Sequence, residues 1–245
     1  MRLSLKLLAS VGLVAAAALA AVTTGYGSTP ELSTYRVTLV NLTSGQPFSP
    51  PVAATHQKAI RMFEVGELAS DELAAIAQAG DEASMFRRFS ASDQVTQAVD
   101  VGRPVTRSGH PVGGFTDTVT FEIAAAPGDK FSLATMLICT NDGFLGLDAV
   151  KLPKHGSQEF FLAGYDAGRE QNTERSEDLV DPCSALGSVP LRGDPNGNRD
   201  SGPGITTSPT EQIQHHPGIA GNADLSVASH SWTDPVAKVS IERIG

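Results

Sequence analysis

Two apolar runs in the middle of the chain each end in a carboxylate next to a glycine-containing turn. Asp142 precedes Gly143, and Asp166 stands two residues before Gly168, with a third carboxylate at Glu170. Calcium takes about six to eight oxygen ligands, usually carboxylates together with loop carbonyls, and glycine lets the backbone turn those carbonyls inward. A calcium site formed by Asp142, Asp166 and Glu170 is therefore one interpretation of this pattern.

The residue types do not require a metal, because Asp and Gly are also ordinary turn residues. Strands that bind nothing often end in the same kind of acidic turn. The spacing alone therefore leaves two interpretations open, a calcium site and a pair of plain turns. In both, the carboxylates lie where strands end, so the arrangement of the strands decides whether they meet.

Alternating apolar and polar segments that are rich in β-branched residues predict that strands dominate the chain. Gly- and Pro-containing turns separate these segments, which favours an antiparallel β-sandwich and an all-β fold class. The segments expected to form strands include Tyr35–Thr43, Lys58–Val65, Thr116–Ile123, Phe131–Ile138, Phe144–Val150, Glu159–Tyr165 and Val236–Ile244.

A short helical insertion is expected after the second strand. Ser70 is a good N-cap, and the acids Asp71 and Glu72 suit the positive end of the helix dipole. Gly80 ends this helix, and a second short helix is expected to begin near Asp81. We expect both helices to pack on the sheet, and a groove that binds a partner is the alternative.

The N-terminus has the features of a removable export signal. Arg2 and Lys6 form a basic segment, the apolar run 7–20 is short for a membrane span, and Ala18–Ala20 provides a small-x-small cleavage pattern. An uncleaved membrane anchor is the alternative, but a polar segment follows directly. The predicted organisation is a signal peptide at 1–20, a short linker at 21–33 and one β-sandwich domain at 34–245.

The charge balance argues against two classes of partner. The chain of 245 residues carries 18 Lys and Arg against 27 Asp and Glu, a formal charge of −9. Removal of residues 1–20 would take away two cations and no acid, which gives −11. Such an acidic protein has no electrostatic attraction for nucleic acid or for an anionic membrane surface. We expect a periplasmic or secreted protein with no membrane span after signal cleavage.

Cys139 and Cys183 are the two cysteines of the chain. In an oxidising compartment a disulfide between them is expected, and it would brace the acidic site because Cys139 closely precedes Asp142. The alternative is that Cys139 is a buried free thiol that packs as a small hydrophobe.

Several separated segments resemble those of one family, in the family's order, and together they cover nearly all of the chain after the signal. The chain resembles the spondin N-terminal domain family, which occurs in matrix proteins such as F-spondin and mindin and in exported bacterial proteins. The segments that carry the resemblance are Tyr35–Leu39, Gly66–Asp81, Gly113–Phe115, Asn141–Leu147, Tyr165–Gly168 and Pro235–Ile244.

The resemblance implies an antiparallel β-sandwich with one bound calcium and no known catalytic activity. The family's calcium ligands include the aspartate of an S-P-D-W-like turn and two acids of a D-A-G-T-D-like turn, which correspond here to Asp142, Asp166 and Glu170. Glu170 replaces the family's aspartate, and Arg169 stands where a small polar residue is usual. Glutamate can still bind calcium, even through both oxygens, so Glu170 stays in the predicted set.

A second acidic segment, Asp194–Asp200, places oxygen-bearing side chains at alternate positions, as calcium loops do. Its glycine comes too early for an EF-hand, and no acid stands at the twelfth position. We interpret residues 190–209 as a flexible polar surface loop, with a second calcium site as the alternative. The tripeptide Arg192-Gly193-Asp194 matches an integrin-type motif, but matches of three residues often arise by chance.

The histidines raise the possibility of an enzyme. His155, the adjacent His215 and His216, and His230 lack the spacing of a catalytic zinc site, and the chain has no G-x-S-x-G motif. A carboxylate held by calcium is a poor proton donor, which argues against a glycoside hydrolase. A secreted or periplasmic hydrolase with a structural calcium and a His/Asp catalytic pair is the alternative function.

The function expected from these observations is recognition without catalysis. We expect an exported calcium-binding β-sandwich module that binds a surface or matrix partner, either a protein or a glycan, as in cell adhesion. Calcium would neutralise three carboxylates that otherwise repel one another and would hold their loops in one shape. A structural envelope protein whose metal serves stability only is a further alternative.

Overall fold

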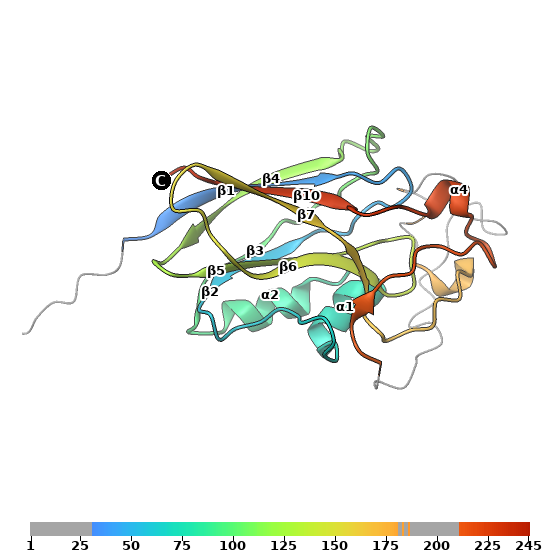
Figure 1. Ribbon diagram of the computed structural model, residues 1–245, viewed down its shortest axis with the longest axis horizontal. Coiled ribbons are helices and arrows are strands. Elements are labelled where there is room, and N and C mark those ends of the chain that lie inside the picture. The colour runs from blue at the N-terminus through green and yellow to red at the C-terminus, as the bar shows by residue number, and fades with distance from the viewer. Residues whose placement is uncertain (1–30, 181–182, 184–185, 187–210) are drawn as a thin grey trace, which may run out of the picture.

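The computed structural model describes residues 31–180, 183, 186 and 211–245 (Figure 1). The predicted signal peptide, most of the predicted linker and the Asp194–Asp200 segment lie outside these residues. Strands predominate and form two antiparallel sheets, so the predicted all-β sandwich is confirmed. No helix in the described ranges combines the length and the apolar character that a membrane crossing requires.

The first sheet has four strands in the order β4-β1-β10-β7. Its strands are β1 (Ser33–Asn41), β4 (Thr118–Ala125), β7 (Ser157–Leu162) and β10 (Ala237–Arg243). β1 pairs with β4 on one side and with β10 on the other, which joins the two ends of the described chain in one sheet. The alternating pattern predicted β1, β4 and β10 to within a few residues.

The second sheet has six strands in the order β3-β2-β5-β6-β8-β9. Its strands are β2 (Val52–His56), β3 (Val95–Asp100), β5 (Lys130–Met136), β6 (Gly143–Lys151), β8 (Gly164–Asp166) and β9 (Gln214–His215). β6 and β8 are neighbours, so the two acidic turns of the sequence leave adjacent strands of one sheet.

Two strand predictions were wrong in detail. The second strand is not Lys58–Val65 but β2, which begins directly after Pro51 and is buried along its whole length. A fully buried strand of small residues lacks the alternation that reveals half-buried strands. The predicted strand Glu159–Tyr165 divides at Ala163 into β7 and β8, which belong to different sheets.

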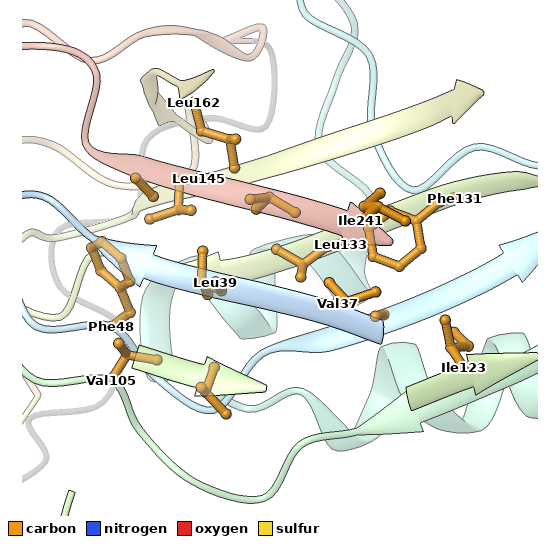
Figure 2. Close-up of a cluster of buried hydrophobic side chains, with 14 of the residues drawn as sticks. Val37, Leu39, Phe48, Val105, Ile123, Phe131, Leu133, Leu145, Leu162 and Ile241 are labelled. Atoms are coloured by element: carbon orange, nitrogen blue, oxygen red, sulfur yellow. The ribbon is translucent and has the colours of Figure 1, made fainter. Parts of the chain in front are cut away.

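The core lies between the two sheets and is built from the inward-facing side chains of both (Figure 2). Burial of each large apolar side chain stabilises the fold by about 1.5–3 kcal/mol. The residues labelled in Figure 2 are Val37, Leu39, Phe48, Val105, Ile123, Phe131, Leu133, Leu145, Leu162 and Ile241.

Two helices cover the outer face of the six-stranded sheet (Figure 1). They are α1 (Asp71–Ala79) and α2 (Ala83–Ser90), and they follow β2 in the chain, as predicted. The Ser70 side chain accepts a hydrogen bond from the Leu73 amide, and Gly80 ends α1 in the left-handed conformation. Two shorter helical turns, η1 (Ser176–Asp178) and α4 (Val227–His230), lie in the connections after β8.

Candidate metal centre

The turn between β5 and β6 fixes the position of Asp142. The Thr140 hydroxyl donates to the Leu137 carbonyl (2.6 Å) and accepts from the Gly143 amide (2.8 Å). A Cβ at position 143 would collide with the Thr140 side chain, so this close approach requires glycine. The turn holds Asp142 fully buried at the start of β6.

The β8 strand brings Asp166 next to this turn. Asp166 lies directly opposite Gly143 in the β6–β8 register, and the Ala167 amide donates to the Asp142 carbonyl (3.1 Å). The Gly168 amide then donates to Asp166 Oδ1 (2.7 Å). Gly168 has φ of +68°, and a Cβ there would lie 2.6 Å from the Glu211 carbonyl oxygen, so this position also requires glycine. The two acidic turns therefore meet in space.

The Asp142 carboxylate is only half satisfied. Its Oδ2 accepts from the amides of Arg169 (2.6 Å) and Glu170 (3.0 Å), whereas its buried Oδ1 has no hydrogen-bond partner among the described residues. Burial, and next the charge of Asp166, raise the pKa of Asp142 to about 7, although the two amide bonds act in the opposite direction. When Asp142 is ionised, its Oδ1 therefore carries negative charge in a buried position without a partner among the described residues.

Asp166 and Glu170 are also buried, and neutral amides bind both. Asp166 Oδ2 accepts from Asn172 Nδ2 (2.7 Å), and Glu170 Oε1 accepts from Gln78 Nε2 (2.9 Å), a residue of α1. The guanidinium of Arg169 turns to the N-terminus of α1, where it donates to the Ala69 carbonyl (3.0 Å) and to Asp71 (2.7 Å). The cation next to Glu170 in sequence is thus bound by α1.

The side chains in this set suit calcium, because each would bind the ion through carboxylate oxygens. One of these oxygens, Asp142 Oδ1, is buried and has no hydrogen-bond partner among the described residues. Within the described residues, however, no three His, Cys, Asp or Glu side chains are placed so that they alone could hold a metal ion. A calcium ion here would need backbone carbonyls or water in addition, which calcium sites commonly use. The ligand set Asp142, Asp166 and Glu170 stays a prediction.

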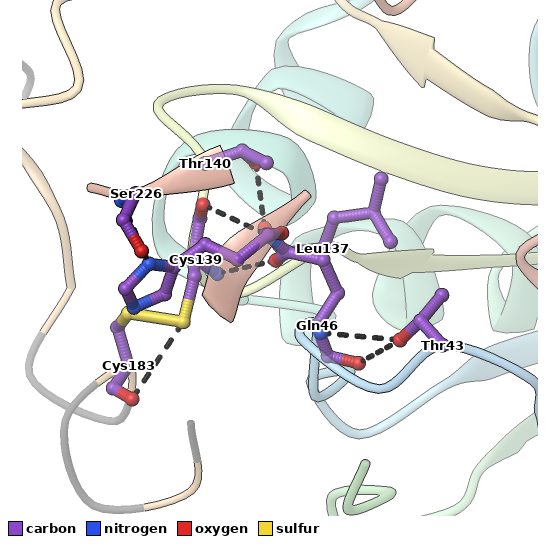
Figure 3. The surroundings of a disulfide bond; sticks show 8 residues. Thr43, Gln46, Leu137, Cys139, Thr140, Cys183 and Ser226 are labelled. Atoms are coloured by element: carbon purple, nitrogen blue, oxygen red, sulfur yellow. Dashed lines mark hydrogen bonds between the residues drawn. A yellow bond between two sulfur atoms is a disulfide. The ribbon is translucent and has the colours of Figure 1, made fainter. Parts of the chain in front are cut away.

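The predicted disulfide is present and lies beside this turn (Figure 3). Cys139 and Cys183 are bonded with their Cα atoms 4.9 Å apart. Gln46 holds the same strand end, because its Oε1 accepts from the Cys139 amide (2.9 Å) and its Nε2 donates to the Cys139 carbonyl (3.1 Å). The disulfide thus joins the turn before Asp142 to the segment that follows the Glu170 loop.

The loop after Glu170 contains residues that the sequence did not single out. Glu174 has φ of +55°, and its carboxylate accepts from the backbone amides of residues 220, 221 and 222 at 2.5, 2.8 and 3.1 Å. Asn141 Oδ1 accepts from the Glu174 amide (3.2 Å). The polar run that follows Glu170 was the one available signal, but its partners lie more than 30 residues away in sequence.

The histidines of the hydrolase alternative hold the backbone or face solvent. Nδ1 of His216 accepts from the Gly218 amide and Nδ1 of His230 from the Ser226 amide, both at 3.0 Å. Burial lowers the pKa of His216 to about 4, against the charge of Asp166, and burial also lowers the pKa of His230. His215 points away from His216 and pairs with Asp234 at the surface.

Comparison with known proteins identifies one family. No curated protein matches the chain. The Spondin_N family profile matches residues 41–178, more than half of the chain. The matched range contains the three predicted calcium ligands and Cys139. The chain therefore belongs to the spondin N-terminal domain (Spondin_N) family.

Proposed function

We propose that the protein is an exported calcium-binding recognition module that carries out no catalysis. The observation that carries this proposal is the buried carboxylate of Asp142, whose Oδ1 has no partner among the described residues and which lies beside the second acid, Asp166. Two adjacent buried carboxylates destabilise each other when both are ionised. A bound divalent cation offsets that repulsion and gives the unsatisfied oxygen a partner.

Calcium fits this donor set better than zinc or magnesium. Zinc prefers nitrogen and sulfur ligands in tetrahedral sites, and magnesium demands a compact octahedral shell. Calcium tolerates irregular loops that combine carboxylates, carbonyls and water. Here Asp142 and Asp166 would bind the ion, with Glu170 held nearby by Gln78 as a third ligand. The ion would fix the two loops in one conformation.

Export and recognition are supported by the family and by the covalent chemistry. The Cys139–Cys183 disulfide is compatible with an oxidising compartment, and the chain carries the features of an N-terminal signal. We infer a periplasmic or secreted location and a surface partner, either a protein or a glycan. His215 pairs with Asp234, and among the described residues no serine or cysteine is hydrogen-bonded to His215.

Thermal unfolding with and without calcium tests the metal. We expect a chelator to lower the melting temperature by several degrees and added calcium to restore it, because the ion binds the native state and not the unfolded chain. Asp166→Ala should have the same melting temperature in chelator and in calcium. Asp93→Ala, at an exposed acid outside the cluster, should keep the full response. Identical melting curves of the unaltered protein in chelator and in calcium would overturn the proposal.

An activity screen tests the absence of catalysis. The purified protein should show no turnover on panels of ester and glycoside substrates at calcium saturation. Turnover that disappears in a His215→Ala variant would establish the hydrolase instead.

A further inference from the structure

A pocket of about 530 Å³ opens at the end of the sandwich opposite the candidate metal centre. Its lining comes from the start of β1, the β4–β5 turn, and the ends of β6 and β10 (Figure 1). β6 leads from the acidic turn at Gly143 to the pocket at Lys151, a span of roughly 26 Å at about 3.3 Å per residue. The volume falls in the usual range of small-molecule sites.

The pocket is basic although the protein is acidic. Its lining contains four cations, Lys130, Lys151, Lys154 and Arg243. The described residues include 14 Lys and Arg, and six of these form ion pairs. The four pocket cations are half of the eight that form none. Positive charge is therefore concentrated at this end, on cations that form no ion pair within the described residues.

Two of these cations face each other across neighbouring strands. Lys130 of β5 and Lys151 of β6 are direct partners in the antiparallel register, so their side chains share one face of the sheet. Like charges in this position destabilise a sheet. An anion bound between the two lysines would reduce their repulsion. Binding would therefore offset the destabilisation that the like-charge pair causes in the free protein.

Further donors surround this pair. The Arg243 guanidinium is held by hydrogen bonds to the carbonyls of Lys154 (3.0 Å) and Gly245 (3.2 Å), which fixes its position. Tyr35 lines the pocket with 6% of its surface exposed, and its hydroxyl has no hydrogen-bond partner among the described residues. A hydroxyl without a partner at a pocket wall can donate a hydrogen bond to a ligand.

The acidic side chains of the lining do not cancel this charge. Asp129 is 9% exposed, and its carboxylate accepts from the Thr96 hydroxyl (2.5 Å) and from the Ala126 amide (2.8 Å). Glu31 is exposed at the rim and forms no ion pair within the described residues. The lining carries four cations and two acids, so a net positive charge remains.

We propose that this pocket binds a small ligand that carries a phosphate or sulfate group. Lysine and arginine bind such oxyanions through charge-assisted hydrogen bonds, and the Tyr35 hydroxyl supplies a further donor. An extended polyanion is disfavoured because the chain as a whole carries a formal charge of −9 and repels it. The pocket is separate from the proposed calcium site, and anion binding there does not depend on the proposed function.

Calorimetric titration in a chelating buffer of constant ionic strength tests the pocket, independently of calcium. The probes are glucose 6-phosphate, inorganic sulfate and, as the neutral control, glucose. We expect saturable binding of the phosphate ester and of sulfate, and none of glucose. Lys151→Gln should weaken binding by about tenfold, because it removes one charge-assisted contact. Lys58→Gln changes an exposed lysine outside the pocket and should leave the affinity within about twofold of the unaltered protein.

The melting temperature of the ligand-free variants gives a second measurement. Lys151→Gln should melt higher than Lys58→Gln, because only the former removes the like-charge pair with Lys130. The proposal fails if neither anion binds at about 20 mM, or if the two lysine variants lose affinity equally. Sedimentation of the protein with phosphatidylglycerol vesicles, without binding of glucose 6-phosphate, would also overturn it, because a lipid surface would then be the ligand.

Discussion

One oxygen atom, Oδ1 of Asp142, determines how the candidate metal centre behaves. It is buried without a hydrogen-bond partner in the described part of the chain, while Oδ2 of the same carboxylate is bound by two amides. Burial, and next the charge of Asp166, raise the pKa of Asp142 to about 7, so the metal-free carboxylate takes up a proton as the pH falls through that value. A cation and a proton therefore compete for the same oxygen.

Asp142→Asn separates these two outcomes. The amide is neutral and close in shape, and its oxygen can accept the bonds from the Arg169 and Glu170 amides. In chelator at about pH 7.5 we expect the variant to be more stable than the unaltered protein, by roughly 1–3 kcal/mol, because the buried charge is gone. It should gain nothing from calcium. Urea denaturation measures both effects, and a variant that is stabilised by calcium as strongly as the unaltered protein would contradict the assignment.

The pH dependence of metal-free stability has contributions of both signs. The pKa of Asp142 is about 7 in the native state and 3.8 for an unperturbed aspartate, so this group lowers stability as the pH rises through that window. Buried His216, with a pKa of about 4 against 6.5, raises stability as the pH rises from about 4 to 6.5. Asp142→Asn removes the first contribution, so the contribution of His216 to the pH dependence should remain without the opposing one. Its free energy of unfolding should increase with pH more steeply than that of the unaltered protein, and parallel profiles would contradict this.

At the scale of elements, two glycines and one register decide whether the acids meet. Gly143 lets Thr140 close the β5–β6 turn, and Gly168 lets the loop after β8 pass the backbone of Glu211. The sequence predicted both turns from their composition. It did not predict that β8 separates from β7 at Ala163 and joins the other sheet, because the apolar run continues through the division.

Gly168→Ala tests the second turn. A Cβ there meets a backbone oxygen at 2.6 Å and forces an L-residue to φ of +68°, so we expect a loss of about 2–4 kcal/mol in unfolding free energy and weaker calcium binding. Gly102→Ala is the matched control, because φ is +66° there and no atom lies within 4 Å of the added Cβ. It should lose only about 1 kcal/mol. Equal losses in urea denaturation would show that the contact with Glu211 is unimportant.

Removal of the disulfide tests how firmly the acidic turn is held. Cys139 and Cys183 are 44 residues apart, and opening a loop of this size costs about 4 kcal/mol in the chain-entropy account. We expect the Cys139→Ala, Cys183→Ala double variant to lose a comparable unfolding free energy and to bind calcium more weakly, since the turn before Asp142 is then less constrained. A double variant with unchanged calcium affinity would show that the hydrogen bonds of Gln46 and Thr140 order this turn without the disulfide.

Across the whole molecule, the two ends of the sandwich differ in charge. The acidic turns lie at one end of β6, and the basic pocket lies at the other, so one strand connects the proposed calcium site to the proposed anion site. Composition predicted the acidic character of the chain but not this division. The pocket cations come from three separate parts of the sequence, Lys130, Lys151 with Lys154, and Arg243, and the folding of the two sheets brings these parts together.

The fold class, the outer helices and the disulfide were predictable because each depends on local pattern or on a single pair of residues. The partners of the carboxylates were not. Gln78 and Asn172 are polar residues without a distinctive spacing, and their bonds to Glu170 and Asp166 depend on the packing of α1 and of the loop after β8. Buried β2 was missed for a related reason, since its side chains carry no alternation.

Metal analysis of the purified protein tests the central claim most directly. Mass spectrometry with an inductively coupled plasma, applied to protein desalted without chelator, measures the identity and the stoichiometry of the metal together. We expect about one calcium per chain, and none in Asp166→Ala prepared in the same way. Protein that contains no calcium, or that carries the same amount in Asp166→Ala, would contradict a calcium site between the two acidic turns.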